Sequence, residues 1–128
     1  MTDRELYETA LSMTEKAYAP FSGFKVGAAL LAENGKVFTG VNVENSSLGG
    51  TICAERTAFV KAISEGVYDF KKIAVVSEEG EVWPCGICRQ FMKEFCDDDF
   101  KIITGSGADS LHIFTMAEIL PEGFRLKR

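Results

Sequence analysis

Three cysteines and one glutamate stand in this sequence at spacings that could build a hydrolytic zinc site. Glu55 follows Cys53 by two positions, and Cys85 and Cys88 stand three apart in a later segment. A catalytic zinc ion usually takes three protein ligands and leaves its fourth position to water, whereas a structural zinc ion fills all four positions with protein ligands. Three thiols beside one carboxylate that is not a ligand therefore indicate a catalytic zinc, with Glu55 available to move protons.

Two other uses of these cysteines stay open. The Cys-x-x-Cys pair of residues 85–88 could be a redox dithiol, but that use gives Cys53 and Glu55 no part. A purely structural zinc would need a fourth ligand, and Cys96 is too far along the same predicted helix, about 12 Å from the pair at 1.5 Å per residue. We expect Cys96 to be a buried thiol, and His112, the only histidine, to have a core or surface role.

The pattern of the surrounding sequence predicts the elements that must carry these side chains. Apolar residues at helical spacing indicate helices, and Asn34-Gly35 between two β-like runs predicts a hairpin. Cys53 then falls in the first turn of one helix, and the later cysteine pair lies on one face of another, so two helix dipoles favour the thiolates. In chain order, we expect a helix over 3–17, strands over 25–33 and 36–43, a helix over 51–65, a strand over 73–76, a helix over 84–96, strands near 101–104 and 111–114, and a helical turn from Met116.

The order of these elements predicts an α/β fold. A hairpin followed by strand–helix–strand alternation implies a mixed sheet layered between helices. The length of 128 residues is enough for one core, so we expect a single domain over 1–128.

Composition and charge restrict the partners. Hydrophobic residues at 46% and charged residues at 26% are typical of a soluble globular protein. No run approaches the roughly 20 apolar residues of a membrane span, and the N-terminus lacks the pattern of a signal peptide. We therefore expect a cytoplasmic protein with reduced thiols and no membrane partner.

A small molecule is the expected partner rather than a nucleic acid. The net charge is −5, with 19 acidic against 14 basic residues, whereas nucleic-acid binders need a basic face. The basic tail at 125–128 is short enough to be a solvated end. Residues 105–107 have too few glycines for a phosphate-binding loop, which disfavours a nucleotide ligand.

The motifs taken together resemble those of the small cytidine deaminases of pyrimidine salvage. Cys-x-Glu followed by Pro-Cys-x-x-Cys is the signature of zinc deaminases. This resemblance implies a three-layer α/β/α sandwich with a mixed five-stranded sheet, and a homotetramer with active sites at the subunit contacts. The matching segments follow one another over nearly the whole chain, at residues 18–22, 24–30, 42–45, 51–58, 84–90 and 120–121.

The resemblance also implies a role for each residue of the site. Cys53, Cys85 and Cys88 would bind Zn²⁺, and Glu55 would move protons. Arg56 would hydrogen-bond the ligand sulfurs and offset their negative charge, although it could otherwise be a solvated helix residue. The implied reaction is the hydrolytic deamination of cytidine and deoxycytidine, in which water adds at C4, N3 is protonated, and ammonia leaves to give uridine or deoxyuridine. This enzyme would hydrolyse the C–N bond of a cyclic amidine and need no other cofactor.

Five further residues would contact the nucleoside. In the family, the residue matching Phe24 stacks on the pyrimidine, those matching Asn42 and Glu44 grip the ribose hydroxyls, and Ala54 lies among the binding residues. Phe124 resembles an aromatic residue that reaches the site of a neighbouring subunit. An amide and a carboxylate two apart on a strand share one face and suit hydroxyl groups. Without the resemblance, Asn42 and Glu44 would be polar residues at a strand end, and Phe24 a core residue.

Departures from the family pattern keep alternatives open. Leu48 stands where many members carry tyrosine, Gly49-Gly50 precedes the first cysteine, and Trp83 replaces a small residue. The Gly-Gly pair resembles relatives that deaminate cytosine-bearing aminonucleoside antibiotics, whereas Glu44 favours a ribose. A deaminase of a modified cytosine nucleoside is therefore the alternative. A zinc-stabilised oligomerisation module, in which Glu55 moves no proton, and a nucleic-acid deaminase, disfavoured by the acidic charge, are the other rivals.

Overall fold

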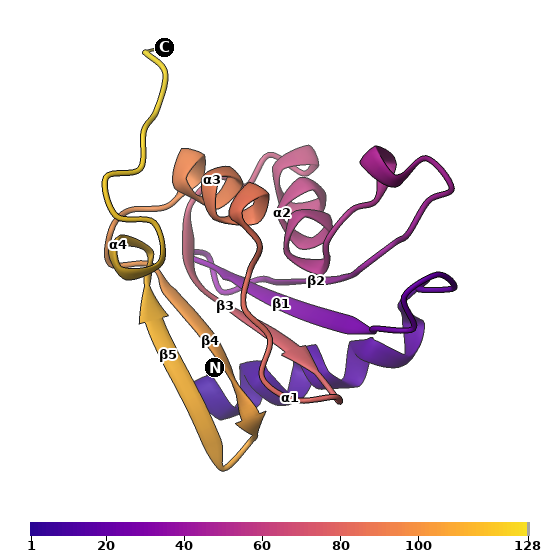
Figure 1. Cartoon of the computed structure of the whole chain (residues 1–128). Helices are drawn as coiled ribbons and strands as arrows, with labels where there is room; N and C mark the ends of the chain where they lie inside the picture. Colours follow the sequence, from indigo (N-terminus) through magenta and orange to yellow (C-terminus); the bar gives the residue numbers. More distant parts are fainter. Residues whose placement is uncertain (128) are drawn as a thin grey trace.

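A mixed five-stranded sheet lies at the centre of the computed structural model, which describes residues 1–127 (Figure 1). The strand order is β2-β1-β3-β4-β5, with β3 and β4 parallel and the other neighbours antiparallel. The prediction of a mixed sheet in an α/β fold is therefore confirmed. In chain order, the elements are α1 (Asp3–Met13), η1 (Thr14–Lys16), β1 (Val26–Ala32), β2 (Val37–Val41), η2 (Leu48–Gly50), α2 (Ala54–Ser64), β3 (Phe70–Ser77), α3 (Gly86–Phe95), β4 (Lys101–Gly107), β5 (Ser110–Thr115) and α4 (Met116–Ile119).

Helices cover both faces of this sheet. Helix α1 packs on β1 and β3 on one face, and α2 and α3 lie on the opposite face, as Figure 1 shows. Leu6, Tyr7 and Ala10 bury the apolar side of α1, while Phe59 of α2 is fully buried in the second core. The three-layer arrangement follows because both faces of the central strands are apolar.

The predicted hairpin is present with shorter strands than the sequence indicated. Every residue of β1 is buried, which agrees with its nearly continuous apolar run. At the turn, Gly35 has a φ of 90°, a conformation that glycine adopts without a steric penalty. The Asn34 side chain accepts a hydrogen bond from the Lys36 amide at 2.9 Å, so the turn residues stabilise the hairpin locally.

The first helix ends earlier than predicted. Thr2 is its N-cap and forms a capping box with Glu5, but α1 stops at Met13 and the chain continues as a single 3-10 turn. The Thr14 hydroxyl donates to the carbonyl of Leu11 at 2.8 Å, a local bond that competes with continued α-helix. The predicted helix over 3–17 was therefore too long.

Both helices that carry cysteines begin later than predicted. Cys53 and Cys85 are the N-caps of α2 and α3, with extended ψ angles of 156° and 166°. Ile52 pairs with Val43 in an isolated bridge, which keeps the chain extended up to the cap. Pro84 precedes the cap of α3, so its predicted place in the first helical turn was wrong.

Helix α2 lies unusually close to strand β2. A Cβ atom on Gly40 would stand 2.4 Å from the carbonyl oxygen of Ala54 and 2.6 Å from the amide nitrogen of Ala58. The Thr57 hydroxyl adds a hydrogen bond to the Val41 carbonyl at 3.0 Å. These contacts fix the start of α2, and with it Cys53, on the sheet. Within residues 1–127, no helix is long and apolar enough to cross a membrane.

Candidate metal centre

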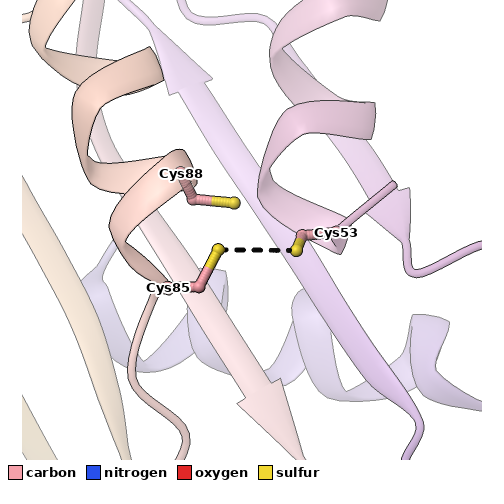
Figure 2. Close-up of side chains that lie close together, drawn as sticks. All are labelled: Cys53, Cys85 and Cys88. Carbon is pink, nitrogen blue, oxygen red and sulfur yellow. Dashed lines mark hydrogen bonds between the residues drawn. The ribbon is translucent and has the colours of Figure 1, made fainter. Parts of the chain in front are cut away.

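Three cysteine sulfurs from two helices meet above the sheet. Figure 2 shows Cys53 at the start of α2 and Cys85 and Cys88 at the start of α3, with their side chains directed toward one another. The Cys53 and Cys85 sulfurs are 3.8 Å apart, and all three lie within 4.8 Å of one another. Among the described residues, this is the one group of three or more His, Cys, Asp or Glu side chains close enough to hold a metal ion.

The spacing of the sulfurs fits a zinc ion. Zinc–sulfur bonds of about 2.3 Å in a tetrahedral arrangement place neighbouring sulfurs about 3.8 Å apart. All four cysteines are free thiols, and neither N-cap thiol makes a capping hydrogen bond. Both N-cap sulfurs therefore remain available as ligands at the positive ends of two helix dipoles. Within residues 1–127, three thiols thus form a group that could hold a metal ion and that has room for a fourth ligand of another kind.

The thiols hold their protons unequally. Hydrogen bonding from Cys88, with further help from Arg56 and Cys85, lowers the pKa of Cys53 to about 5. The same hydrogen bond and the burial of Cys88 raise the pKa of its own thiol. Because thiolates this close repel one another, full ionisation of the cluster requires a cation, which a divalent metal supplies.

Arg56 stands beside the sulfurs, as expected from the sequence. Its Nη2 lies 3.6 Å from the Cys53 sulfur and 3.4 Å from the carbonyl oxygen of Thr51. Its buried Nε has no hydrogen-bond partner within residues 1–127. The guanidinium of Arg56, which lies beside the Cys53 thiol and has an unused N–H donor, suits a site at which several thiolates carry negative charge.

Glu55 lies two residues beyond Cys53 and is only 4% exposed. Burial raises the pKa of its carboxyl group to about 7, and the negative charge of Cys53 acts in the same direction. A carboxyl group in this environment exchanges protons near neutral pH, which is what a general acid–base needs. The arrangement therefore combines a group of thiols that could hold a metal ion with a nearby carboxyl group whose pKa is close to neutral.

The residues expected to grip ribose are already engaged within the chain. Asn42 accepts a hydrogen bond from the Val26 amide at 2.9 Å and donates one to the Phe24 carbonyl at 2.8 Å. Glu44 accepts from the Phe21 amide at 2.9 Å, and from both the amide and the hydroxyl of Ser22. These bonds leave one N–H of Asn42 and an acceptor position on Glu44, so both side chains retain capacity for a ligand.

The hydrophobic residues singled out from the sequence differ in exposure. Phe24 is 38% exposed and Phe124 is 62% exposed, whereas Ala54 is fully buried against β2. Leu48, in η2, is 77% exposed. The ring of Trp83 packs on β5, with its centroid 4.2 Å from that of Phe114.

Neither Cys96 nor His112 belongs to the metal cluster. Cys96 is 2% exposed within the core beneath α3, as predicted, and burial raises the pKa of its thiol well above the usual range. His112 is exposed on β5, with its Nδ1 2.9 Å from a carboxylate oxygen of Glu81. Cys96 is thus the buried thiol that was predicted, and His112 lies at the surface.

Sequence reasoning missed three residues that shape this site. The Ser22 hydroxyl donates a hydrogen bond to the Glu44 carboxylate. Gly40 allows α2 to lie close to β2, and the Arg89 side chain donates to the carbonyl group of Pro84, just before Cys85. The position of Arg89, four residues after the Cys85 N-cap, is the one local signal that could have indicated a helix side chain reaching back toward the cap.

Comparisons with known proteins agree with this geometry. The family model described as "Cytidine and deoxycytidylate deaminase zinc-binding region" matches residues 1–104. Cytidine deaminase of Sporosarcina psychrophila is 50% identical over 111 residues, which cover 86% of this chain and 82% of that protein. A solved structure of cytidine deaminase from Burkholderia pseudomallei superposes with a TM-score of 0.90 at 44% identity, covering 97% of this chain and 100% of the other. A more distant relative, blasticidin-S deaminase of Bacillus cereus, is 34% identical over 130 residues, which cover 93% of this chain and 89% of that protein.

Proposed function

The chain belongs to the cytidine and deoxycytidylate deaminase family, and from this premise we propose that it is a zinc-dependent hydrolase that deaminates cytidine and deoxycytidine. The observation that carries the proposal is the convergence of three thiols at two helix N-termini, next to a buried carboxyl group. The products would be uridine and deoxyuridine, with release of ammonia.

Each side chain of the centre has a part in this reaction. Cys53, Cys85 and Cys88 hold the zinc ion, which, when bound, supplies the Lewis acidity that makes water a nucleophile near neutral pH. Glu55 would take the proton that the water gives up and deliver it to N3 of the cytosine ring, while the hydroxyl group bonds to C4. It would then move the proton of that hydroxyl group to the amino group, so that the C4–N bond breaks, ammonia leaves and the C4 carbonyl forms. Arg56 donates to the ligand sulfurs and reduces the negative charge of three thiolates.

The nucleoside would bind at the rim of this centre. We assign pyrimidine stacking to Phe24 and the sugar hydroxyls to Asn42 and Glu44, whose remaining hydrogen-bonding capacity suits them. Ala54 completes the set from the start of α2. Burial of Glu55 and Cys88, against exposure of Phe24 and Cys85, favours a small ligand entering from the exposed side of the cysteine group.

We further propose that the active unit is a homotetramer in which Phe124 reaches a neighbouring subunit's site. The support is the exposure of large apolar side chains that a lone chain would leave in water, namely Phe24, Val43, Leu48, Ile87 and Phe124. Light scattering on the purified protein, against the 14.1 kDa of one chain, measures this assembly.

A cytoplasmic role in pyrimidine salvage is part of the same proposal. Four free cysteines, three of them poised as metal ligands, suit a reducing compartment. The reaction acts on a free nucleoside and contributes no phosphate chemistry, so neither a nucleic acid nor a membrane is needed as a partner. One domain over residues 1–128 is sufficient to carry it.

The test combines turnover with a zinc assay on wild type and Glu55→Gln. We expect the wild type to convert cytidine to uridine, and the variant to keep its zinc but lose at least about 10²-fold in kcat, because the proton carrier is gone. Glu65→Gln, at the exposed C-terminal end of the same helix, is the matched control and should retain full activity. Equal activity of Glu55→Gln and wild type would instead favour a non-catalytic zinc module.

A modified cytosine nucleoside is the second candidate substrate. It is supported by Gly49-Gly50 and by the 34% identity to blasticidin-S deaminase. A panel of cytidine, deoxycytidine and blasticidin S separates the two candidates. Zinc-loaded wild type that leaves cytidine untouched but deaminates blasticidin S would replace our first assignment.

A further inference from the structure

Cys85 is the thiol of the metal centre with the least support from its own surroundings. Residues 81–85 form neither helix nor strand, and Cys85 is exposed, whereas Cys88 is fully buried and Cys53 partly so. The thiol must nevertheless stand 3.8 Å from that of Cys53. Some other contact has to fix the backbone that enters α3.

Arg89 supplies that contact. Its Nε donates to the carbonyl oxygen of Pro84 at 2.8 Å, the carbonyl immediately before Cys85. Its Nη1 donates to the carbonyl oxygen of Ile119, at the end of α4, at 2.9 Å. One planar guanidinium thus links the backbone just before Cys85 with α4, the helix that follows β5 in the chain. Pro84 is buried, so its carbonyl group would be costly to leave without a donor.

Trp83 gives the guanidinium a second support. The guanidinium carbon of Arg89 lies 6.0 Å from the centroid of the Trp83 ring, within the range of a cation–π contact. The ring in turn packs on Phe114 and lies 5.8 Å from His112 of β5. His112 also contacts Glu81 at the start of the same irregular segment. The segment is therefore anchored to β5 on one side and to α4 through Arg89.

We propose that Arg89 is a positioning residue that holds Cys85 in place for the metal, with Trp83 as the platform for its guanidinium. Within residues 1–127 the Arg89 side chain has no hydrogen bond to a cysteine sulfur, so it would act through the Pro84 carbonyl. Lysine cannot replace it, because an ammonium lacks the planar fork that reaches two carbonyl groups at once. This inference rests on the zinc site of the proposed function.

The test measures how fast the zinc-loaded protein gives up its metal to an excess of the chelator 4-(2-pyridylazo)resorcinol. We expect Arg89→Lys and Arg89→Gln to release zinc about tenfold faster than wild type or more, which is the usual effect of losing a partner in the outer shell of a metal site. Trp83→Leu should accelerate release less strongly, because the two carbonyl bonds remain. Cobalt-loaded samples should show altered thiolate-to-metal absorption for the Arg89 variants.

Arg125→Lys is the matched control. Arg125 also donates to two backbone carbonyl groups of α3 and its cap, Lys93 at 2.7 Å and Cys96 at 2.9 Å, but at the end of the helix away from the metal. Its release rate should stay within about twofold of wild type, since the outer-shell effect belongs to partners near the ligands.

The outcomes separate this inference from the proposed function. Unchanged release in the Arg89 variants, or equal acceleration in Arg125→Lys, would overturn the positioning role while leaving the zinc centre intact. Wild-type protein that binds no zinc would overturn the proposed function itself. If the Arg89 variants do not fold, Trp83→Leu decides the question, and release at the wild-type rate would refute the inference.

Discussion

Replacing Gly40 by alanine tests whether the contact between β2 and α2 places the chemical groups of the site. The new methyl group would stand 2.4 Å from the Ala54 carbonyl oxygen and 2.6 Å from the Ala58 amide nitrogen. Ordinary van der Waals contact begins at 3.4 Å, so the first turn of α2 must move away from β2 by about 1 Å. Cys53 and Glu55 stand at that start and move with it.

Two magnitudes follow from this displacement. Overpacking of a well-packed contact costs about 1–3 kcal/mol in the free energy of unfolding. For a domain of this size, that corresponds to a fall in Tm of roughly 4–12 °C. A 1 Å misplacement of a catalytic group lowers the rate by about 10²-fold, so kcat/KM for cytidine should fall by a similar factor.

The assay pairs cytidine turnover with thermal unfolding and zinc content. Gly107→Ala is the control, because a Cβ at Gly107 meets nothing within 4 Å and the backbone there is not left-handed. We expect its stability to stay within about 0.5 kcal/mol of wild type and its activity to be unchanged. A Gly40→Ala variant with normal kcat/KM and normal zinc retention would show that the edge strand β2 absorbs the methyl group, and would refute the reasoning.

Two further predictions concern stability. Phe59→Ala should lower the free energy of unfolding by about 3–5 kcal/mol in a urea titration, because the ring is fully buried and contacts four other phenylalanine rings. The control is Val60→Ala, next in the chain and 47% exposed, which should change the free energy of unfolding by less than about 0.5 kcal/mol. Similar losses in both variants would contradict the packing argument. Asp3 has its pKa lowered below 3.8, chiefly by a hydrogen bond from Lys72, so its stabilising effect is present above that pH and is lost as the pH falls through the folded-state pKa. Asp3→Asn should therefore be less stable than wild type by up to about 1 kcal/mol at pH 7 and equal to it in strong acid, and a difference that persists in acid would exclude the ion pair as its cause.

Local patterns predicted the elements well because their causes are local. The Asn34-Gly35 turn, the apolar run of β1 and the end of α2 at Ser64, one residue before the predicted end, depend on neighbours within a few residues. Helix boundaries were less accurate, as at Thr14 and Pro84. A helix begins where its first amide groups stop having other partners, and at Ile52 the partner is Val43 on a different segment.

The residues around the cysteine group also differ in how far their roles could be predicted from the sequence. Glu44 was assigned to ribose binding from the family resemblance, yet its carboxylate also orders the turn at Phe21 and Ser22. The contact of Gly40 with α2 and the bond from Arg89 to Ile119 join different elements, and no local pattern encodes either of them. Arg89 reaches Ile119 across 30 residues of sequence.

The sequence by itself determined the chemistry available to this protein, because thiol and carboxyl groups at Cys53, Glu55, Cys85 and Cys88 have the ligand types and order that a catalytic zinc requires. Only the tertiary structure decided that the Cys53 and Cys85 sulfurs, 32 residues apart in the chain, stand 3.8 Å from each other, and that the Glu55 carboxyl group is buried. Distances across the fold depend on how α2 and α3 pack on the sheet, through the close contact at Gly40 and the carbonyl bonds of Arg89. The kinds of side chain that could bind the metal are set by the sequence, whereas the distances between them are set by how the helices pack on the sheet.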